Sequence, residues 1–229
     1  MTDACDRNVG HQHTSLQRLG GLAMPLRTAG VVLAGGAGRR MGGGKPLQHL
    51  GERTLIEHVI NRFRPQVEAL WISARDNRGT LVGYGLPVIE DRWTDKPGGA
   101  LAAVVSALHA ATLQDFDCVA TVPCDTPFLP RDLARRLHER LLPTRAPGII
   151  VESEDGLQPT IGLWRTAALD ALLHSFDAGD RALGSVFRAQ GALILDVARC
   201  QWTKWSFFNV NTRADLARAT NHLRSDSEA

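Results

Sequence analysis

Residues 31–45 read VVLAGGAGRRMGGGK, an apolar run followed by a loop rich in glycine and cations. The apolar run has the composition of a buried parallel strand. Six of the ten residues 35–44 are glycines, which lack Cβ atoms and let backbone N–H groups approach a polyphosphate closely. Three cations add positive charge for the same ligand: Arg39, Arg40 and Lys45. An ordinary flexible turn is the alternative, but it leaves these cations unexplained.

Two familiar glycine motifs do not fit this loop. A Walker loop requires Gly where Arg39 stands and Ser or Thr in place of Pro46. A dinucleotide fingerprint that starts at Gly36 requires Gly in place of Met41. The loop therefore indicates a polyphosphate site of another kind.

The rest of the chain alternates strand patterns with helix patterns. Apolar runs predict strands at residues 67–73, 86–89, 117–122, 148–151, 160–164 and 192–197. Helical periodicity and end signals predict helices over residues 55–63, 98–113, 130–142, 165–175, 181–189 and 213–223. We therefore predict a single-domain, Rossmann-like three-layer α/β/α fold with a mostly parallel sheet, whose strand-end loops share one edge. Residues 1–28 are expected to form a flexible N-terminal tail and residues 29–229 the domain.

Composition excludes several classes of protein. The 229 residues are 44% hydrophobic and 22% charged, which suits a globular domain. The net charge of +2 lacks the basic excess of proteins that bind nucleic acid or membrane surfaces. Residues 1–30 contain no apolar core of signal-peptide length, so we expect a cytoplasmic protein. Cys118 and Cys124 are expected to be small buried hydrophobic residues rather than redox groups.

Residues 122–128 (VPCDTPF) place a carboxylate directly after a buried strand, in a turn bracketed by prolines. Mg²⁺ in proteins takes one or two carboxylates and fills its octahedron with waters and phosphate oxygens. Asp125 is therefore a candidate Mg²⁺ ligand beside the polyphosphate. The alternative is an Asx turn that caps the helix expected near Pro130.

Residues 33–42 match the pattern LAGG-x-x-x-R-M-G, and from Val31 to Arg218 the chain resembles the molybdenum cofactor guanylyltransferases. The resemblance implies a nucleotidyltransferase domain of the nucleotide-diphospho-sugar transferase type. It implies catalytic roles for Arg40, Lys45 and Asp125, with Asp125 as the metal ligand. It also implies nucleotide contacts at Leu33, Ala34, Gly35, Gly36, Lys45, Ser73, Asp91, Gly98 and Asp125. Ser73 stands where the family commonly has Asn.

The segment 208–212 (FNVNT) precedes the last helix, which Thr212 and Asp215 are expected to cap. Two Asn that flank one Val put both amides on one side of an extended segment. The resemblance places this segment in the active-site cleft, and implies acceptor contacts at Pro159, Thr160, Asn209 and Asn211. A turn made of helix-capping amides is the alternative for the Asn pair.

Three further side chains leave two interpretations open. Arg181 either meets an acceptor phosphate or lies on a solvated helix face. Trp202 and Trp205 either stack on a pterin or fill the core or an interface.

The reaction implied by the resemblance is transfer of GMP from GTP to the phosphate of molybdopterin or molybdenum cofactor, with Mg²⁺ as cofactor and pyrophosphate released. No covalent nucleophile is expected, because the acceptor phosphate attacks directly. Expected partners are GTP, molybdopterin, and the enzymes that deliver or receive the cofactor, with no nucleic acid and no membrane. The alternatives are a cytidylyl- or sugar-phosphate nucleotidyltransferase, a non-catalytic GTP- or molybdopterin-binding module, and a GTP hydrolase, which the missing Walker loop disfavours.

Overall fold

One sheet of seven strands organises the part of the chain that the computed structural model describes, namely residues 26–35, 44–75, 78–90 and 99–227. The strands are ordered β5-β4-β1-β6-β8-β7-β9. They are β1 (Thr28–Leu33), β4 (Ala69–Ser73), β5 (Val88–Ile89), β6 (Cys118–Pro123), β7 (Gly148–Ser153), β8 (Gly156–Arg165) and β9 (Leu193–Asp196). All neighbours are parallel except β8, which runs antiparallel to β6 and to β7. The prediction of a mostly parallel sheet is confirmed.

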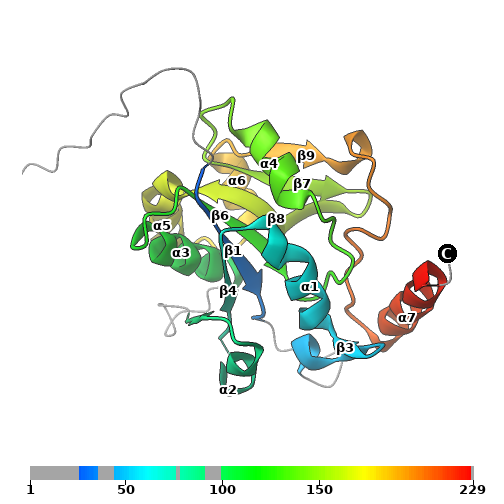
Figure 1. Cartoon of the computed structure of the whole chain (residues 1–229). Helices are drawn as coiled ribbons and strands as arrows, with labels where there is room; N and C mark the ends of the chain where they lie inside the picture. Colours follow the sequence, from blue (N-terminus) through cyan, green and yellow to red (C-terminus); the bar gives the residue numbers. More distant parts are fainter. Residues whose placement is uncertain (1–25, 36–43, 76–77, 91–98, 228–229) are drawn as a thin grey trace, which may run out of the picture.

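Two helices cover the first face of this sheet (Figure 1). They are α1 (Leu55–Phe63) and α4 (Leu133–Leu141). Val59 of α1 and Leu137 of α4 lie in one buried cluster with Val122 of β6. The helix periodicity of residues 55–63 therefore serves to bury one apolar stripe against the sheet, as predicted.

The opposite face is covered by α3 (Gly99–Thr112), α5 (Leu169–Asp177) and α6 (Leu183–Ala189) (Figure 1). Val104 of α3 packs in a second buried cluster with Trp164 of β8. α3 is apolar on nearly all sides because it lies between the sheet and α5. Helices on both faces confirm the predicted three layers.

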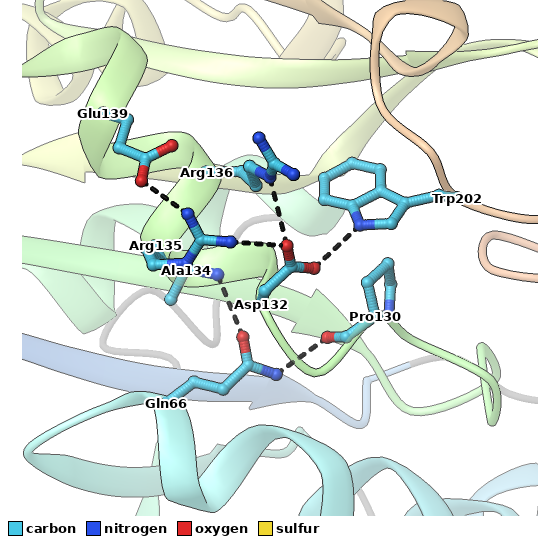
Figure 2. Close-up of polar contacts among 8 residues, drawn as sticks. All are labelled: Gln66, Pro130, Asp132, Ala134, Arg135, Arg136, Glu139 and Trp202. Carbon is cyan, nitrogen blue, oxygen red and sulfur yellow. Dashed lines mark hydrogen bonds and ion pairs between the residues drawn. The ribbon is translucent and has the colours of Figure 1, made fainter.

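Local signals set several helix ends. The side chain of Thr54 and that of Glu57 form a capping box at the start of α1. The prediction for residues 130–142 was wrong by three residues at its start, because α4 begins at Leu133. The carbonyl of Pro130 accepts a hydrogen bond from the side-chain amide of Gln66 at 2.8 Å, so this proline lies in the connection that precedes the helix (Figure 2).

A short hairpin, α2 and α7 do not belong to the three layers. The strands β2 (His49–Leu50) and β3 (Arg53–Thr54) form a short antiparallel hairpin that the sequence analysis did not anticipate, and α2 (Arg78–Leu81) is a single turn. The helix α7 (Arg213–Ser227) lies away from the sheet, beside the hairpin (Figure 1). A third buried cluster joins the hairpin to α7, and it is formed by Leu50, Leu55, Phe128, Val210 and Ala219.

The folded region begins earlier than the sequence indicated. β1 starts at Thr28, which is 4% exposed. The side chain of Arg27 donates to Glu68 Oε1 at 2.8 Å and its backbone N–H donates to Asp117 Oδ2 at 2.9 Å. Residues 26–28 are thus part of the fold, whereas residues 1–25 lie outside the described residues.

None of the helices in the described ranges combines the length and the apolar character needed to cross a bilayer.

Candidate active site

The carboxyl ends of three parallel strands meet at one edge of the sheet. β1 pairs with β4 and β6, so that Leu33 lies opposite Ser73 on one side and the last residue of β6 on the other. The N–H of Ala34 donates to the Ser73 carbonyl at 2.8 Å, and the N–H of Cys124 donates to the Leu33 carbonyl at 3.1 Å. Asp125 follows directly. The predicted nucleotide-contacting residues of the first strand therefore lie next to the predicted metal ligand.

Three segments that are far apart in the sequence converge on the ammonium group of Lys45. This lysine begins the 3₁₀-helix η2 (Lys45–Leu47), directly after Gly44, whose φ of 59° lies in the left-handed region that glycine adopts easily. Lys45 Nζ donates to Asp125 Oδ2 and also to Asn211 Oδ1, the latter at 2.6 Å. The side chains of Lys45 and Asp125 are only 14% and 15% exposed. Three predicted site residues from three separate motifs thus form one cluster.

Asp125 is fixed by its backbone, and its carboxylate points to the cluster. The Asp125 carbonyl accepts the N–H of Val210 at 2.9 Å, and the neighbouring Thr126 hydroxyl donates to the Pro123 carbonyl at 3.1 Å. The carboxylate binds Lys45 instead of capping the following helix, so the structure does not support the Asx-turn alternative.

The second oxygen of the Asp125 carboxylate fits a cation. Oδ1 is buried and has no hydrogen-bond partner within the described residues. Buried carboxylate oxygens are normally hydrogen-bonded or bind a metal, so this atom is suited to a divalent cation. The described part of the chain holds no cluster of three or more potential metal-binding side chains. Mg²⁺ requires only one or two carboxylates when phosphate oxygens and waters complete its shell.

The segment that carries Asn209 and Asn211 is anchored on both sides. Val210 between them is fully buried. Asp215 Oδ2 accepts the N–H and the hydroxyl of Thr212 at 2.9 and 2.8 Å, and the N–H of Asp215 donates to the Thr212 hydroxyl at 3.1 Å. This reciprocal cap of α7 confirms the prediction. Burial acts to raise the pKa of the Asp215 carboxyl, but these hydrogen bonds hold it below its ordinary value.

The two asparagine amides have different partners. Asn211 reaches Lys45, whereas Asn209 Nδ2 donates to Gln158 Oε1 of β8 at 3.3 Å. Gln158 Nε2 in turn donates to the hydroxyl of Ser153 at the end of β7, at 3.1 Å. Helix-capping amides are therefore not the explanation of the Asn pair, since Thr212 and Asp215 form the cap. No sequence signal pointed to Ser153, because only the antiparallel pairing of β7 with β8 brings it to Gln158.

The other predicted acceptor residues lie on β8. Pro159 and Thr160 are both half-buried. The Pro159 ring lies close to Gly184 at the start of α6. Neither residue belongs to the polar cluster around Lys45.

Several predicted site residues cannot be placed. Gly36 and Arg40 of the glycine-rich loop, together with Asp91 and Gly98, lie outside the described residues. Gly35, the last described residue before that loop, is exposed and has open space beside its α-carbon.

The two cysteines at the ends of β6 are structural. Cys118 and Cys124 are buried and free, at the start of β6 and just beyond its end. Burial raises the pKa of the Cys118 thiol to about 12 and that of Cys124 well above its usual range. Such thiols remain protonated and unreactive at neutral pH. This confirms their prediction as small buried hydrophobic residues.

Both tryptophans take part in packing. Trp205 stacks on His222 with ring centroids 4.1 Å apart, and it meets Phe128 edge-on. Trp202 packs edge-on against Phe207, and its Nε1 donates to Asp132 Oδ1 at 2.8 Å (Figure 2). These contacts favour core filling over stacking on a pterin.

Arg181 has a local structural role. Its guanidinium donates to the carbonyls of Phe176 and Asp180 at 2.7 and 2.6 Å and lies over the Phe176 ring. It therefore satisfies one carbonyl in the last turn of α5 and one in the connection to α6, and neither interpretation of the sequence described these contacts.

Comparison with known proteins identifies the family. The MobA-like NTP transferase domain matches residues 30–193. The chain belongs to this family. The molybdenum cofactor guanylyltransferase of Cereibacter sphaeroides is 38% identical over 204 residues, which cover 88% of this MobA-like chain and 100% of the relative. The protein of the same name from Nitrobacter hamburgensis is 35% identical over 198 residues, which cover 84% of this chain and 92% of the relative.

A solved structure has a similar fold. The crystal structure of molybdopterin-guanine dinucleotide biosynthesis protein A from Archaeoglobus fulgidus superposes with a TM-score of 0.73 at 23% identity. The match covers 86% of this chain and 99% of that protein. The predicted three-layer nucleotidyltransferase fold is therefore confirmed for this MobA-like protein.

Proposed function

We propose that this MobA-like chain is a molybdenum cofactor guanylyltransferase, which transfers GMP from GTP to the phosphate of molybdopterin or molybdenum cofactor. The names of its relatives support the substrates. The observation that carries the proposal is the cluster of Lys45, Asp125 and Asn211 beside the carboxyl ends of the parallel strands. Open α/β sheets bind their ligands at this edge.

The reaction requires positioning rather than a covalent nucleophile. An oxygen of the acceptor phosphate forms a bond to the α-phosphorus of GTP. The bond from that phosphorus to the oxygen bridging to the β-phosphate breaks, and pyrophosphate leaves with the electron pair. The chain must therefore hold two anionic substrates in line and stabilise the charge that develops.

Among the cationic side chains of the described residues, Lys45 is in the best position to stabilise this charge. Its ammonium is a compact charge on a flexible four-carbon stem, so it can move from Asp125 to phosphate oxygens. We propose that Arg40 acts with it on the triphosphate. The proposed nucleotide site comprises Lys45, Arg40 and Asp125 together with Leu33, Ala34, Gly35, Gly36, Ser73, Asp91 and Gly98.

The acceptor is proposed to bind beside the anchored segment 208–212. Asn209 and Asn211 present amide groups there, and both are held by contacts to other elements. Pro159 and Thr160 on β8 complete the proposed acceptor site. Such preorganised amides can orient a polar acceptor without moving.

Mg²⁺ is the proposed metal, and Asp125 is the residue that would hold it. The buried Oδ1 without a partner in the described residues supports this assignment. When bound, Mg²⁺ neutralises charge on the triphosphate and the leaving pyrophosphate. We further propose a cytoplasmic location and partner enzymes that deliver or receive the cofactor; the free thiols of Cys118, Cys124 and Cys200 are typical of a reducing compartment.

Two experiments test the function. The first compares thermal stabilisation by GTP, CTP, ATP and UTP with Mg²⁺. GTP should raise the unfolding temperature most, because mass action stabilises the form that binds. A preference for CTP would indicate a cytidylyltransferase instead.

The second experiment measures pyrophosphate release from GTP with purified molybdopterin as acceptor. Asp125→Asn should lower turnover by about 100-fold or more, the usual effect of losing one electrostatic group at a reaction centre. Asp155→Asn, which changes an exposed carboxylate in the turn between β7 and β8, is the matched control and should retain activity. Tight GTP binding without turnover would support a non-catalytic module.

A further inference from the structure

The carboxylate proposed to bind the metal is already paired with a cation of the chain. Asp125 Oδ2 accepts a hydrogen bond from Lys45 Nζ, while Oδ1 is buried and has no partner in the described residues. The ammonium is also held by Asn211 Oδ1 at 2.6 Å. A divalent cation and the ammonium would therefore have to share one carboxylate in a largely buried place.

Charge repulsion opposes such sharing. Two cations on one carboxylate lie about 4–6 Å apart, given metal–oxygen and nitrogen–oxygen distances of about 2 and 3 Å. Even at the dielectric constant of water, repulsion between a divalent and a monovalent cation at about 5 Å changes an equilibrium roughly tenfold or more. The low exposure of both side chains, 14% and 15%, makes water screening less effective than on an open surface.

A polyphosphate offers Lys45 an alternative partner. The lysine directly follows Gly44, and its long stem allows the ammonium to move while η2 stays in place, because the buried ring of Pro46 anchors that element. Phosphate oxygens attract both the ammonium and the metal, so they remove the competition for Asp125. This step rests on the proposed function.

We propose that Lys45 couples metal binding to nucleotide binding. Its ammonium occupies the Asp125 carboxylate and weakens the binding of free divalent cations. A nucleoside triphosphate draws the ammonium away and leaves the carboxylate to the metal that enters with it. Linkage then requires that nucleotide strengthen metal binding and that metal strengthen nucleotide binding by the same factor.

The test measures Mn²⁺ binding to the full chain without nucleotide or acceptor, from the electron paramagnetic resonance signal of free hydrated Mn²⁺. Lys45→Met should bind Mn²⁺ about tenfold or more tightly than the unsubstituted protein. Lys45→Gln, which keeps a polar side chain, should show the same gain, and it replaces the methionine variant in the test if that variant is poorly folded. Adding Asp125→Asn to either variant should abolish the gain.

The matched control is Lys204→Met, which removes an exposed lysine outside the cluster and should leave Mn²⁺ affinity unchanged. Equal Mn²⁺ affinity in the unsubstituted protein and both Lys45 variants would overturn the proposal. A gain that survives Asp125→Asn, or that Lys204→Met reproduces, would also overturn it. Because no nucleotide or acceptor is present, these outcomes are independent of whether GMP transfer is found.

Discussion

Replacing Trp202 by Phe should loosen the segment that leads to Asn209 and Asn211. Trp202 belongs to the connection between β9 and α7, and its Nε1 donates to Asp132 Oδ1 at 2.8 Å (Figure 2). Arg135 donates to the other carboxylate oxygen of Asp132, at 2.9 Å. Phenylalanine keeps most of the ring packing but removes the donor.

The expected loss of stability follows from the charge and the exposure of the Asp132 carboxylate, which accepts the hydrogen bond. Hydrogen bonds to charged groups contribute about 1.5–3 kcal/mol. The Asp132 side chain is 33% exposed, so water replaces part of the bond, and we expect a coupling of about 1–1.5 kcal/mol. For a chain of this size, that corresponds to a decrease of about 2–6 °C in the unfolding temperature.

The assay is a double-mutant cycle by urea denaturation with Trp202→Phe, Asp132→Ala and the double variant. The cycle isolates the coupling because the contacts of Asp132 with arginines are lost in both of its branches. A coupling energy within about 0.3 kcal/mol of zero would refute the reasoning, because it equals the usual deviation from additivity.

The pH dependence of this contact has a defined sign. Burial acts to raise the pKa of the Asp132 carboxyl, but hydrogen bonds from Trp202 and Arg136 and the nearby positive charges hold it below its ordinary value. A carboxylate with a lowered pKa stabilises the fold fully above about pH 4, the value of an unfolded Asp, and loses this effect as the pH falls through the folded-state pKa. The stability difference between the unsubstituted protein and Trp202→Phe should therefore narrow on acidification, and a difference that widens would contradict the assignment.

Three further measurements test the packing of the sheet, the cap of α7 and the burial of two cysteines. Gly162→Ala would bring its Cβ within 2.5 Å of a backbone oxygen of β7, and should lower the free energy of unfolding by about 2–3 kcal/mol. Gly83→Ala, whose added Cβ would meet open space, is the control, and thermal denaturation of both variants gives the comparison. Thr212→Ala removes the cap of α7 and should lower the free energy of unfolding by about 1 kcal/mol, whereas Thr212→Ser should restore it. Equal stability of the unsubstituted protein and both variants would argue against the cap. Cys118 and Cys124 should resist Ellman's reagent at pH 8 until the protein unfolds, whereas rapid labelling in the native state, located by peptide mass, would disprove their burial.

Local patterns in the sequence predicted much of the fold. The apolar run before the glycines became β1, and the Thr54–Glu57 pair became the capping box of α1, because both signals act within a few residues. The start of α4 was misplaced because proline is common in a first helical turn. Here the side chain of Gln66, in the 3₁₀-helix η3 (Arg64–Gln66), holds Pro130 outside the helix.

Long-range pairing in the site could be predicted only in part. The glycine-rich loop, the turn after β6 and the Asn pair each indicated ligand binding, but nothing local in the sequence shows that Lys45 contacts Asn211, 166 residues away. That contact depends on the segment before α7, which lies beside the turn that follows β6 and is held there by the Val210–Asp125 backbone bond. The contacts of Arg181 are local instead, because its guanidinium donates to carbonyls five and one residues earlier, and neither sequence interpretation included them.

Guanylyl transfer at the Lys45–Asp125 cluster is tested most directly by following isotope from GTP. The full chain is incubated with Mg²⁺, purified molybdopterin and GTP that carries ³²P at either the α- or the γ-phosphorus. We predict that α-label appears in the acceptor product and that γ-label appears in pyrophosphate, and that Asp125→Asn prevents both. Release of γ-label as inorganic phosphate, with α-label retained in GDP, would show hydrolysis and contradict the proposed reaction.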